Sequence, residues 1–484
     1  MADDPAAGPA GQATPAISAA KTELLARWRA GAVPDNLAET ELRGEESTAD
    51  DPPASLQQAR HWFRRDRLTN TTRRNIAFAA VLEARLDYDA LVESVDALAD
   101  RHEVLRTTLY ERAGEVRQRV HRRSMVRCDL VDLRSHGTPF EAAVASVRAV
   151  LNDGLDLTRG PLALALVYRL ADTRHLLAIV CNHVVADGWS LAVALRELDE
   201  IYRSRVEGHT AALPPLPIQY RDYARWQREW LSGAEARAHA RYWEGILRDR
   251  PGKRLPAESA ATNAGDDPSG HLPIAVDTEL TTAVRSFARR SQTTPFVVLL
   301  GAYAAALRER IGADDVLVAI AVARRRLPQT HQLIGFFAGA ICVRIETGGD
   351  PTFAELIRHV HGRCLSGIAH EELDLTGYLR LSEPLRDEDA DPIACAGFFL
   401  QPPLPAFALA AGALEPIEIR SGHVPTEPQI ALFDNGRSIG GGLDYSTRVL
   451  SRGNAAMLAD DFMRFVRSGI RQPTRTLARL CDGA

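Results

Sequence analysis

The segment LLAIVCNHVVADGWSLAVALREL (residues 176–198) holds the residues whose types and spacing could support catalysis. Its apolar run predicts a buried strand that ends near Cys181, and His183 follows where the chain would leave the sheet. In open α/β sheets, ligands gather at the carboxyl ends of the strands. A histidine at such a position can orient or deprotonate a nucleophile, and groups of this kind contribute roughly 10²- to 10⁴-fold to reaction rates.

Asp187 and Gly188 come four and five residues after this histidine. Gly188 permits a tight turn because glycine tolerates positive φ. A helix expected over about residues 189–203 would direct its first N–H groups back toward the turn. The short H-x-x-x-D-G pattern also fits a strand-end histidine that only bonds to a backbone carbonyl, so the spacing alone leaves both interpretations open.

Other chemistries lack their sequence signals. No second histidine or carboxylate stands at metal-ligand spacing from His183, so no metal site is predicted. A nucleophile elbow of the form G-x-S-x-G is absent, which leaves a serine hydrolase unsupported. The glycine patterns that bind phosphates or dinucleotides are absent as well.

The composition is that of a globular protein, since 45% of the 484 residues are hydrophobic and 25% are charged. A formal net charge of −5 argues against a nucleic-acid-binding protein, which presents a concentrated basic face. No apolar stretch is long enough to span a membrane. The acidic N-terminus lacks the apolar core of a signal peptide, and six scattered cysteines indicate free thiols. We therefore expect a cytoplasmic protein that binds neither nucleic acid nor membranes.

The elements that must position the histidine alternate between strands and helices. Residues 1–50 are rich in Ala, Pro and acidic side chains and are expected to be disordered, with one possible helix at residues 17–31. Residues 51–215 are expected to form an N-terminal subdomain that carries the histidine. Residues 216–484 are expected to form a linker helix and a C-terminal subdomain. The whole predicts an α/β fold with mixed sheets.

Three local predictions concern the second half. The pattern of YRDYARWQREWL predicts one helix that continues to about Leu247. Residues 293–310 predict a helix with Thr294 as its N-cap and Pro295 at its first position. The apolar run at residues 332–346 predicts a single buried strand.

NHVVADGWS (182–190) resembles the H-H-x-x-x-D-G motif of the condensation domains of nonribosomal peptide synthetases. Further segments resemble motifs of this family and run in the family's order over nearly the whole chain, which makes the resemblance far more specific than any one motif. They are SLQQARHWF (55–63), RHEVLRTTL (101–109), YRDYARWQ (220–227), VAIAVARRR (318–326), LIGFFAGAICVRI (333–345), HEELDL (370–375), FFLQ (398–401) and LDYSTRVL (443–450).

The resemblance implies two chloramphenicol-acetyltransferase-like subdomains in a V-shaped pseudodimer with a central tunnel. It implies that His183 orients or deprotonates the acceptor nucleophile, and that the N–H of Gly188 helps to stabilise the oxyanion. Asp187 would be structural and would pair with an arginine of the second subdomain. Arg325 is the best match for that arginine, and Arg324 is the alternative.

Departures from the family pattern single out further residues. Asn182 replaces the first motif histidine in a supporting role, and since its amide still offers a donor and an acceptor, activity is expected to survive. Gly339 replaces an asparagine and is expected to open space in or near the tunnel. Trp189 and Arg60 are candidates for the tunnel lining, although core packing for Trp189 and a structural salt bridge for Arg60 fit equally simple patterns.

The resemblance implies a free-standing condensation enzyme without a bound cofactor, because adenylation, thioesterase and carrier segments are absent from the sequence. The acyl group would arrive on the phosphopantetheine of a separate carrier protein. A small-molecule amine or alcohol, or a second carrier protein, would accept it to form an amide or ester. Two alternatives stay open: an acyl-CoA-dependent acyltransferase of the same superfamily, and a catalytically inactive condensation-like module that recruits partner proteins.

Overall fold

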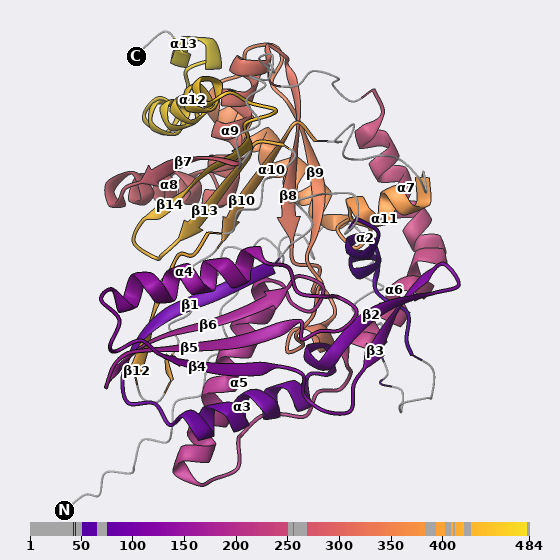
Figure 1. Cartoon of the computed structure of the whole chain (residues 1–484). Helices are drawn as coiled ribbons and strands as arrows, with labels where there is room; N and C mark the ends of the chain where they lie inside the picture. Colours follow the sequence, from indigo (N-terminus) through magenta and orange to yellow (C-terminus); the bar gives the residue numbers. More distant parts are fainter. Residues whose placement is uncertain are drawn as a thin grey trace, which may run out of the picture.

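The computed structural model describes most of the chain, which is shown in Figure 1. The described residues are 42, 44, 51–64, 75–249, 255, 269–382, 394–401, 408–409, 412–420 and 427–481. The disorder predicted for residues 1–50 and the possible helix at residues 17–31 therefore lie outside the described residues, apart from residues 42 and 44.

The first sheet contains, within the described residues, six strands in the order β11–β12–β1–β6–β5–β4. Only the β4–β5 pair is parallel. β6 lies inside the sheet and is buried over most of its length, as its apolar run predicted. The strands are β1 (Asn75–Glu83), β4 (Arg127–Asp132), β5 (Ala163–Ala171), β6 (Arg174–Asn182), β11 (Ala408–Leu409) and β12 (Gly412–Ile417).

Helices cover both faces of this sheet (Figure 1). The helix α4 (Pro139–Asn152) packs on one face. The helices α3 (Tyr88–Arg101) and α5 (Gly188–Glu207) pack on the other face, with the short helix η1 (Glu103–Arg106) and the hairpin of β2 (Thr107–Arg112) and β3 (Glu115–Val120) beside them.

β11 and β12 come from the C-terminal half of the chain and extend the sheet of the N-terminal half. β12 pairs with β1 in antiparallel register, with Ala79 opposite Ile417. The expected division into residues 51–215 and 216–484 did not include this exchange, because short strands carry no local sign of which sheet they will join. The two halves of the fold therefore share a sheet as well as a contact surface.

The second sheet has the order β7–β14–β13–β10–β8–β9 in the described part of the chain. Its strands are β7 (Ser269–Val276), β8 (Asp315–Val322), β9 (Gly339–Glu346), β10 (Ala396–Gln401), β13 (Gln429–Asp434) and β14 (Ile439–Ser446). The main helices of this half are α8 (Thr278–Arg290), α9 (Pro295–Ile311), α10 (Phe353–Ala369) and α12 (Arg452–Arg471), followed by the short α13 (Leu477–Cys481).

The predicted N-cap of α9 is confirmed, because the Thr294 hydroxyl accepts a hydrogen bond from the N–H of Val297 at 3.3 Å. Most of α9 is buried, and it packs in the centre of this half against α10 and α12. The six cysteines are free thiols, as their scattered spacing indicated. No helix in the described segments has the length and apolar character needed to cross a membrane.

The linker prediction was wrong in one respect, because two helices replace the single long one. α6 (Tyr220–Ser232) ends at Gly233, where the backbone is extended, and α7 (Ala234–Leu247) begins directly afterwards. The N–H of Gly233 bonds to the carbonyl of Trp230, which closes α6. Both helices run along the side of the molecule (Figure 1).

The strand predicted over residues 332–346 was also too long, because only β9 (Gly339–Glu346) is a strand. The segment before it forms a loop whose apolar residues Leu333, Ile334 and Phe337 belong to the core of the N-terminal half. Side chains from that half accept hydrogen bonds from the N–H groups of this loop. The apolar run is buried, as predicted, but in a loop that enters the opposite half.

Candidate active site

The turn between β6 and α5 carries the predicted catalytic residue, and Asn182 shapes that turn. The Asn182 side chain donates to Oδ1 of Asn75 at 3.2 Å, and its own Oδ1 accepts the N–H of Val184 at 3.1 Å. Asn75, opposite Asn182 on β1, donates in turn to the carbonyl of Leu151 at the end of α4. Asn182 is buried, and its amide satisfies both strands of the turn, which only a side chain with a donor and an acceptor can do.

His183 follows as the first residue of the turn and is partly buried. Its imidazole packs against the ring of Phe336, with the ring centroids 4.4 Å apart and the planes tilted by 38°. Phe336 lies in the loop before β9, so the two halves of the fold meet at this imidazole. The ring is held from one side, and its partial exposure leaves room for a ligand on another.

Asp187 is the N-cap of α5 and is almost fully buried. Its Oδ1 accepts the N–H and the hydroxyl of Ser190 at 2.8 and 2.7 Å. Its Oδ2 accepts the N–H groups of Phe337 and Ala338, each at 3.1 Å. One carboxylate therefore caps the helix behind the histidine and fixes the loop of the opposite half.

Arg325 supplies the positive partner, as the sequence predicted. Its guanidinium contacts Oδ1 of Asp187 at 3.1 Å and donates to the Ser190 hydroxyl at 2.9 Å. Burial alone would raise the pKa of the Asp187 carboxyl, but the Arg325 charge and the hydrogen bonds outweigh it, so the pKa lies below its usual value. The carboxylate is ionised at neutral pH and joins the two halves.

Gly188 is the first residue of α5, where backbone N–H groups lack helical partners. A Cβ built on Gly188 would lie only 3.2 Å from Nε2 of Gln401, the last residue of β10. The backbone at the helix start is thus closely approached from the opposite half. The donor role of Gly188 toward an oxyanion stays a prediction.

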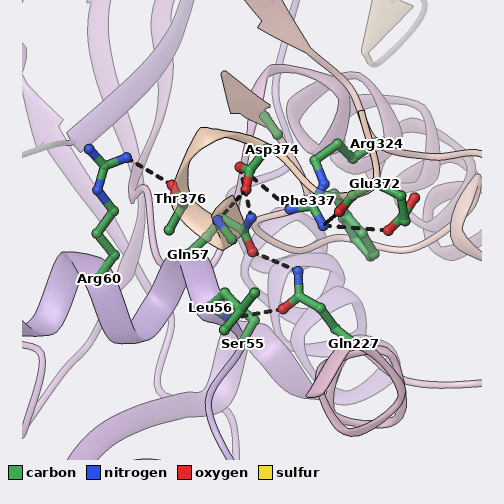
Figure 2. Close-up of polar contacts among 12 residues, drawn as sticks. Ser55, Leu56, Gln57, Arg60, Gln227, Arg324, Phe337, Glu372, Asp374 and Thr376 are labelled. Carbon is green, nitrogen blue, oxygen red and sulfur yellow. Dashed lines mark hydrogen bonds and ion pairs between the residues drawn. The ribbon is translucent and has the colours of Figure 1, made fainter. Parts of the chain in front are cut away.

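Trp189 and Arg60 both make polar contacts with the second half. The indole N–H of Trp189 donates to the carbonyl of His331 at 3.0 Å. Arg60, on α2 (Leu56–Arg64), donates to the Thr376 hydroxyl at 2.8 Å at the start of α11 (Leu375–Ser382) (Figure 2). These contacts favour the structural interpretation of both residues, and a role in lining a tunnel stays a prediction.

The prediction that Gly339 opens space was wrong. A Cβ at this position would lie 2.3 Å from Oδ2 of Asp374 and 2.8 Å from Cδ of Arg324. The volume next to Gly339 is filled by a buried cluster in which Arg324 donates to the carbonyl of Glu372 and forms an ion pair with Asp374 (Figure 2). Glycine is present because these charged side chains need the room.

Replacement of Gly339 by asparagine, the family residue, is expected to destabilise the protein by about 1 to 3 kcal/mol because the new side chain overpacks this cluster. Asp374 is fully buried and cannot swing into solvent. The midpoint of urea unfolding measures the effect. Gly362→Asn, on the exposed face of α10 where nothing approaches a Cβ, is the control. An unchanged midpoint for Gly339→Asn would show that the cluster has spare volume.

Sequence reasoning missed Ser190 and Phe336. Ser190 bonds to Asp187, to Arg325 and to both polar backbone atoms of Gly335. The motif itself contained this signal, because a serine three residues after a helix N-cap can return a hydrogen bond to the cap. Phe336 carried no such signal, since its contact with His183 depends on a loop from the other half. Among the described residues, no group of three or more His, Cys, Asp or Glu could hold a metal ion.

A comparison with protein families decides which family this site belongs to. The Condensation domain family model matches residues 48–481. The chain belongs to the condensation-domain family.

Relatives of this condensation domain are nonribosomal peptide synthetases. It is 33% identical over 387 residues to a linear gramicidin synthase of Brevibacillus parabrevis, which covers 79% of this chain and 5% of that protein. It is 29% identical over 431 residues to enniatin synthase of Fusarium equiseti, which covers 88% of this chain and 14% of that protein. The chain thus spans only a small part of the length of these relatives.

Solved structures confirm the expected pseudodimer fold of two chloramphenicol-acetyltransferase-like halves. The X-domain from teicoplanin biosynthesis matches with a TM-score of 0.77 at 21% identity, covering 91% of this chain and 99% of that one. The first condensation domain of the calcium-dependent antibiotic synthetase, in complex with a substrate analogue, matches with a TM-score of 0.75 at 18% identity, covering 89% and 99%. At these identities the likeness establishes the fold.

Proposed function

We propose that this condensation domain transfers an acyl or aminoacyl group from the phosphopantetheine thioester of a carrier protein to an amine or alcohol. The observation that carries this proposal is the placement of His183, partly exposed between the two halves on a turn held by Asn182 and Asp187. The acceptor nitrogen or oxygen attacks the thioester carbonyl and gives up its proton. The carbon–sulfur bond breaks, the phosphopantetheine thiol leaves with a proton, and an amide or ester remains.

Each residue of the site has one part in this reaction. His183 orients the acceptor or takes its proton, since a positioned imidazole is suited to both at neutral pH. The N–H of Gly188, at the positive end of α5, faces the charge that develops on the carbonyl oxygen. Asp187 and Arg325 neutralise each other and contact no substrate; they fix the helix start and the opposing loop.

The proposal includes activity in trans, with the donor on a separately added carrier protein. The test loads carrier proteins with an acyl group, adds the 484-residue chain and a panel of amines and alcohols, and follows products by mass spectrometry. We expect product from the carrier thioester, and at least about tenfold less from the same acyl group on coenzyme A. Equal or faster transfer from coenzyme A would favour the acyl-CoA-dependent alternative and contradict the proposal.

A second candidate is a recruiting module without catalysis. The observation that favours it is the fold match to an X-domain, which was also solved in complex with OxyB from teicoplanin biosynthesis and matches here with a TM-score of 0.74. The retained His183, Asp187 and Gly188 favour catalysis instead. If no carrier thioester gave product, and the His183→Ala variant retained full function in the producing cell, recruitment would replace the proposed transfer.

A further inference from the structure

Two adjacent glutamines near the start of α2 are both buried, Gln57 with 4% and Gln58 with 0% of its surface exposed. Buried amides need partners, and consecutive helical residues point in different directions. Nε2 of Gln57 donates to Oδ2 of Asp374 in the C-terminal half at 3.1 Å (Figure 2). Nε2 of Gln58 donates instead to the carbonyl of Val184 at 2.9 Å. Neighbouring side chains of one type thus bind different halves of the fold.

The bond from Gln58 completes the support of the catalytic turn. The N–H of Val184 is held by Oδ1 of Asn182, and the N–H of Val185 by the carbonyl of Asn182. Gln58 binds the remaining polar atom between them, the carbonyl of Val184. The N–H of the first peptide group after His183, and both polar atoms of the second, therefore have fixed partners.

Gln58 is itself fixed by the first turn of α2. Its Oε1 accepts the N–H of Ser55 at 3.0 Å, and its N–H donates to the Ser55 hydroxyl at 3.2 Å, which is a reciprocal capping box. The hydroxyl of Tyr220 lies 2.8 Å from Ser55 Oγ and 2.8 Å from the carbonyl of Phe336. Since Phe336 packs on the imidazole, one helix start supports both the turn that bears His183 and the ring beside it.

We propose that Gln58 is a positioning residue for His183, an inference that rests on the proposed acyl transfer. Its carboxamide accepts from Ser55 and donates to Val184 at the same time, which a carboxylate and a thioether cannot do. Loss of the donor frees the carbonyl of Val184, and the imidazole next to it loses its fixed direction. A displacement of about 1 Å at a reacting group can lower a rate by roughly 100-fold.

Three variants test this role. Gln58→Met keeps the length of the side chain but loses both bonds. Gln58→Glu keeps the acceptor for Ser55 and loses only the donor to Val184. Gln57→Met is the matched control, because it removes an equally buried amide from the same helix without touching the turn. For each variant, kcat and KM for the acylated carrier protein, the pH profile of kcat, and the thermal midpoint are measured.

We expect both Gln58 variants to lower kcat at least about tenfold, with KM within about threefold of wild type. Gln57→Met is expected to keep kcat within about twofold, although its thermal midpoint falls as far as that of Gln58→Met. The pH profile gives a readout that a structural role would not move. The carboxyl group introduced by Gln58→Glu can donate to the carbonyl of Val184 once it is protonated, as the amide does in wild type. The rate of this variant relative to wild type is therefore expected to rise as pH falls.

Two failures can be told apart. If wild type turns over no faster than His183→Ala, the proposed acyl transfer fails and this inference falls with it. If wild type is active but Gln58→Glu keeps kcat, or if the Gln57 and Gln58 methionine variants lose kcat equally, the inference alone is overturned. Should Gln58→Met not fold, the comparison of Gln58→Glu with Gln57→Met still decides it.

Discussion

Replacement of His183 by alanine is expected to lower the rate of acyl transfer from a carrier thioester by roughly 10²- to 10⁴-fold, the usual contribution of a positioned acid–base group. The side chain is partly exposed and its backbone is held by Asn182 and Gln58, so the substitution removes the imidazole without breaking the turn. Product formation under single-turnover conditions, followed by mass spectrometry, measures the effect without a contribution from product release.

His175 offers a matched control at the opposite end of the same strand. It is more deeply buried than His183, with 4% of its surface exposed, and lies opposite Leu82 in β1. His175→Ala should lower the thermal midpoint and leave the rate per folded molecule within about threefold. Equal rates for wild type and His183→Ala would contradict the catalytic assignment, whereas equal losses in both histidine variants would point to folding instead.

The strand, turn and helix around His183 could be predicted from the sequence because their causes are local. An apolar run forms the buried strand β6, and Asp187 caps the helix that follows it. The ion pair of Asp187 with Arg325 was also expected, but only from the family resemblance. Distance along the chain gives no physical reason to pair residues 138 positions apart.

The errors share one cause, which is contact between the halves. The loop before β9 has the apolar character of a strand, yet Asp187 and Ser190 bind its N–H groups and Phe337 is buried in the opposite core. Gly339 looked like open space because the side chains that fill it, Arg324 and Asp374, come from other segments. Tertiary contacts of this kind override local pattern, and single-sequence reasoning has no access to them.

The second large effect is expected at the ion pair that joins the two halves. Arg325→Met should destabilise the protein by about 3 to 5 kcal/mol, because it leaves the Asp187 carboxylate buried without its counter-charge. The guanidinium also donates to the carbonyl of Leu333 at 2.8 Å and lies 4.0 Å from the ring of Phe337, so the loop before β9 loses its anchor. The midpoint of urea unfolding, monitored by tryptophan fluorescence, measures the change.

The double variant Asp187→Asn/Arg325→Met separates the pair from its surroundings. If the loss comes from an uncompensated charge, removing the charge of Asp187 as well should restore part of the stability lost in Arg325→Met. Additive losses in the double variant would mean that the two side chains do not stabilise each other.

The pH dependence of stability should change sign with this substitution. In wild type the pKa of Asp187 is lowered, so its contribution is present above the ordinary carboxyl pKa of about 4 and is lost as pH falls through the lowered value. Without Arg325, burial becomes the dominant influence and should raise that pKa above its ordinary value. The variant should then gain stability as pH falls from neutral toward about 4, over a range in which Asp187 of wild type contributes no pH dependence. Parallel urea midpoints of wild type and Arg325→Met between about pH 7 and 4 would contradict this account of the pair.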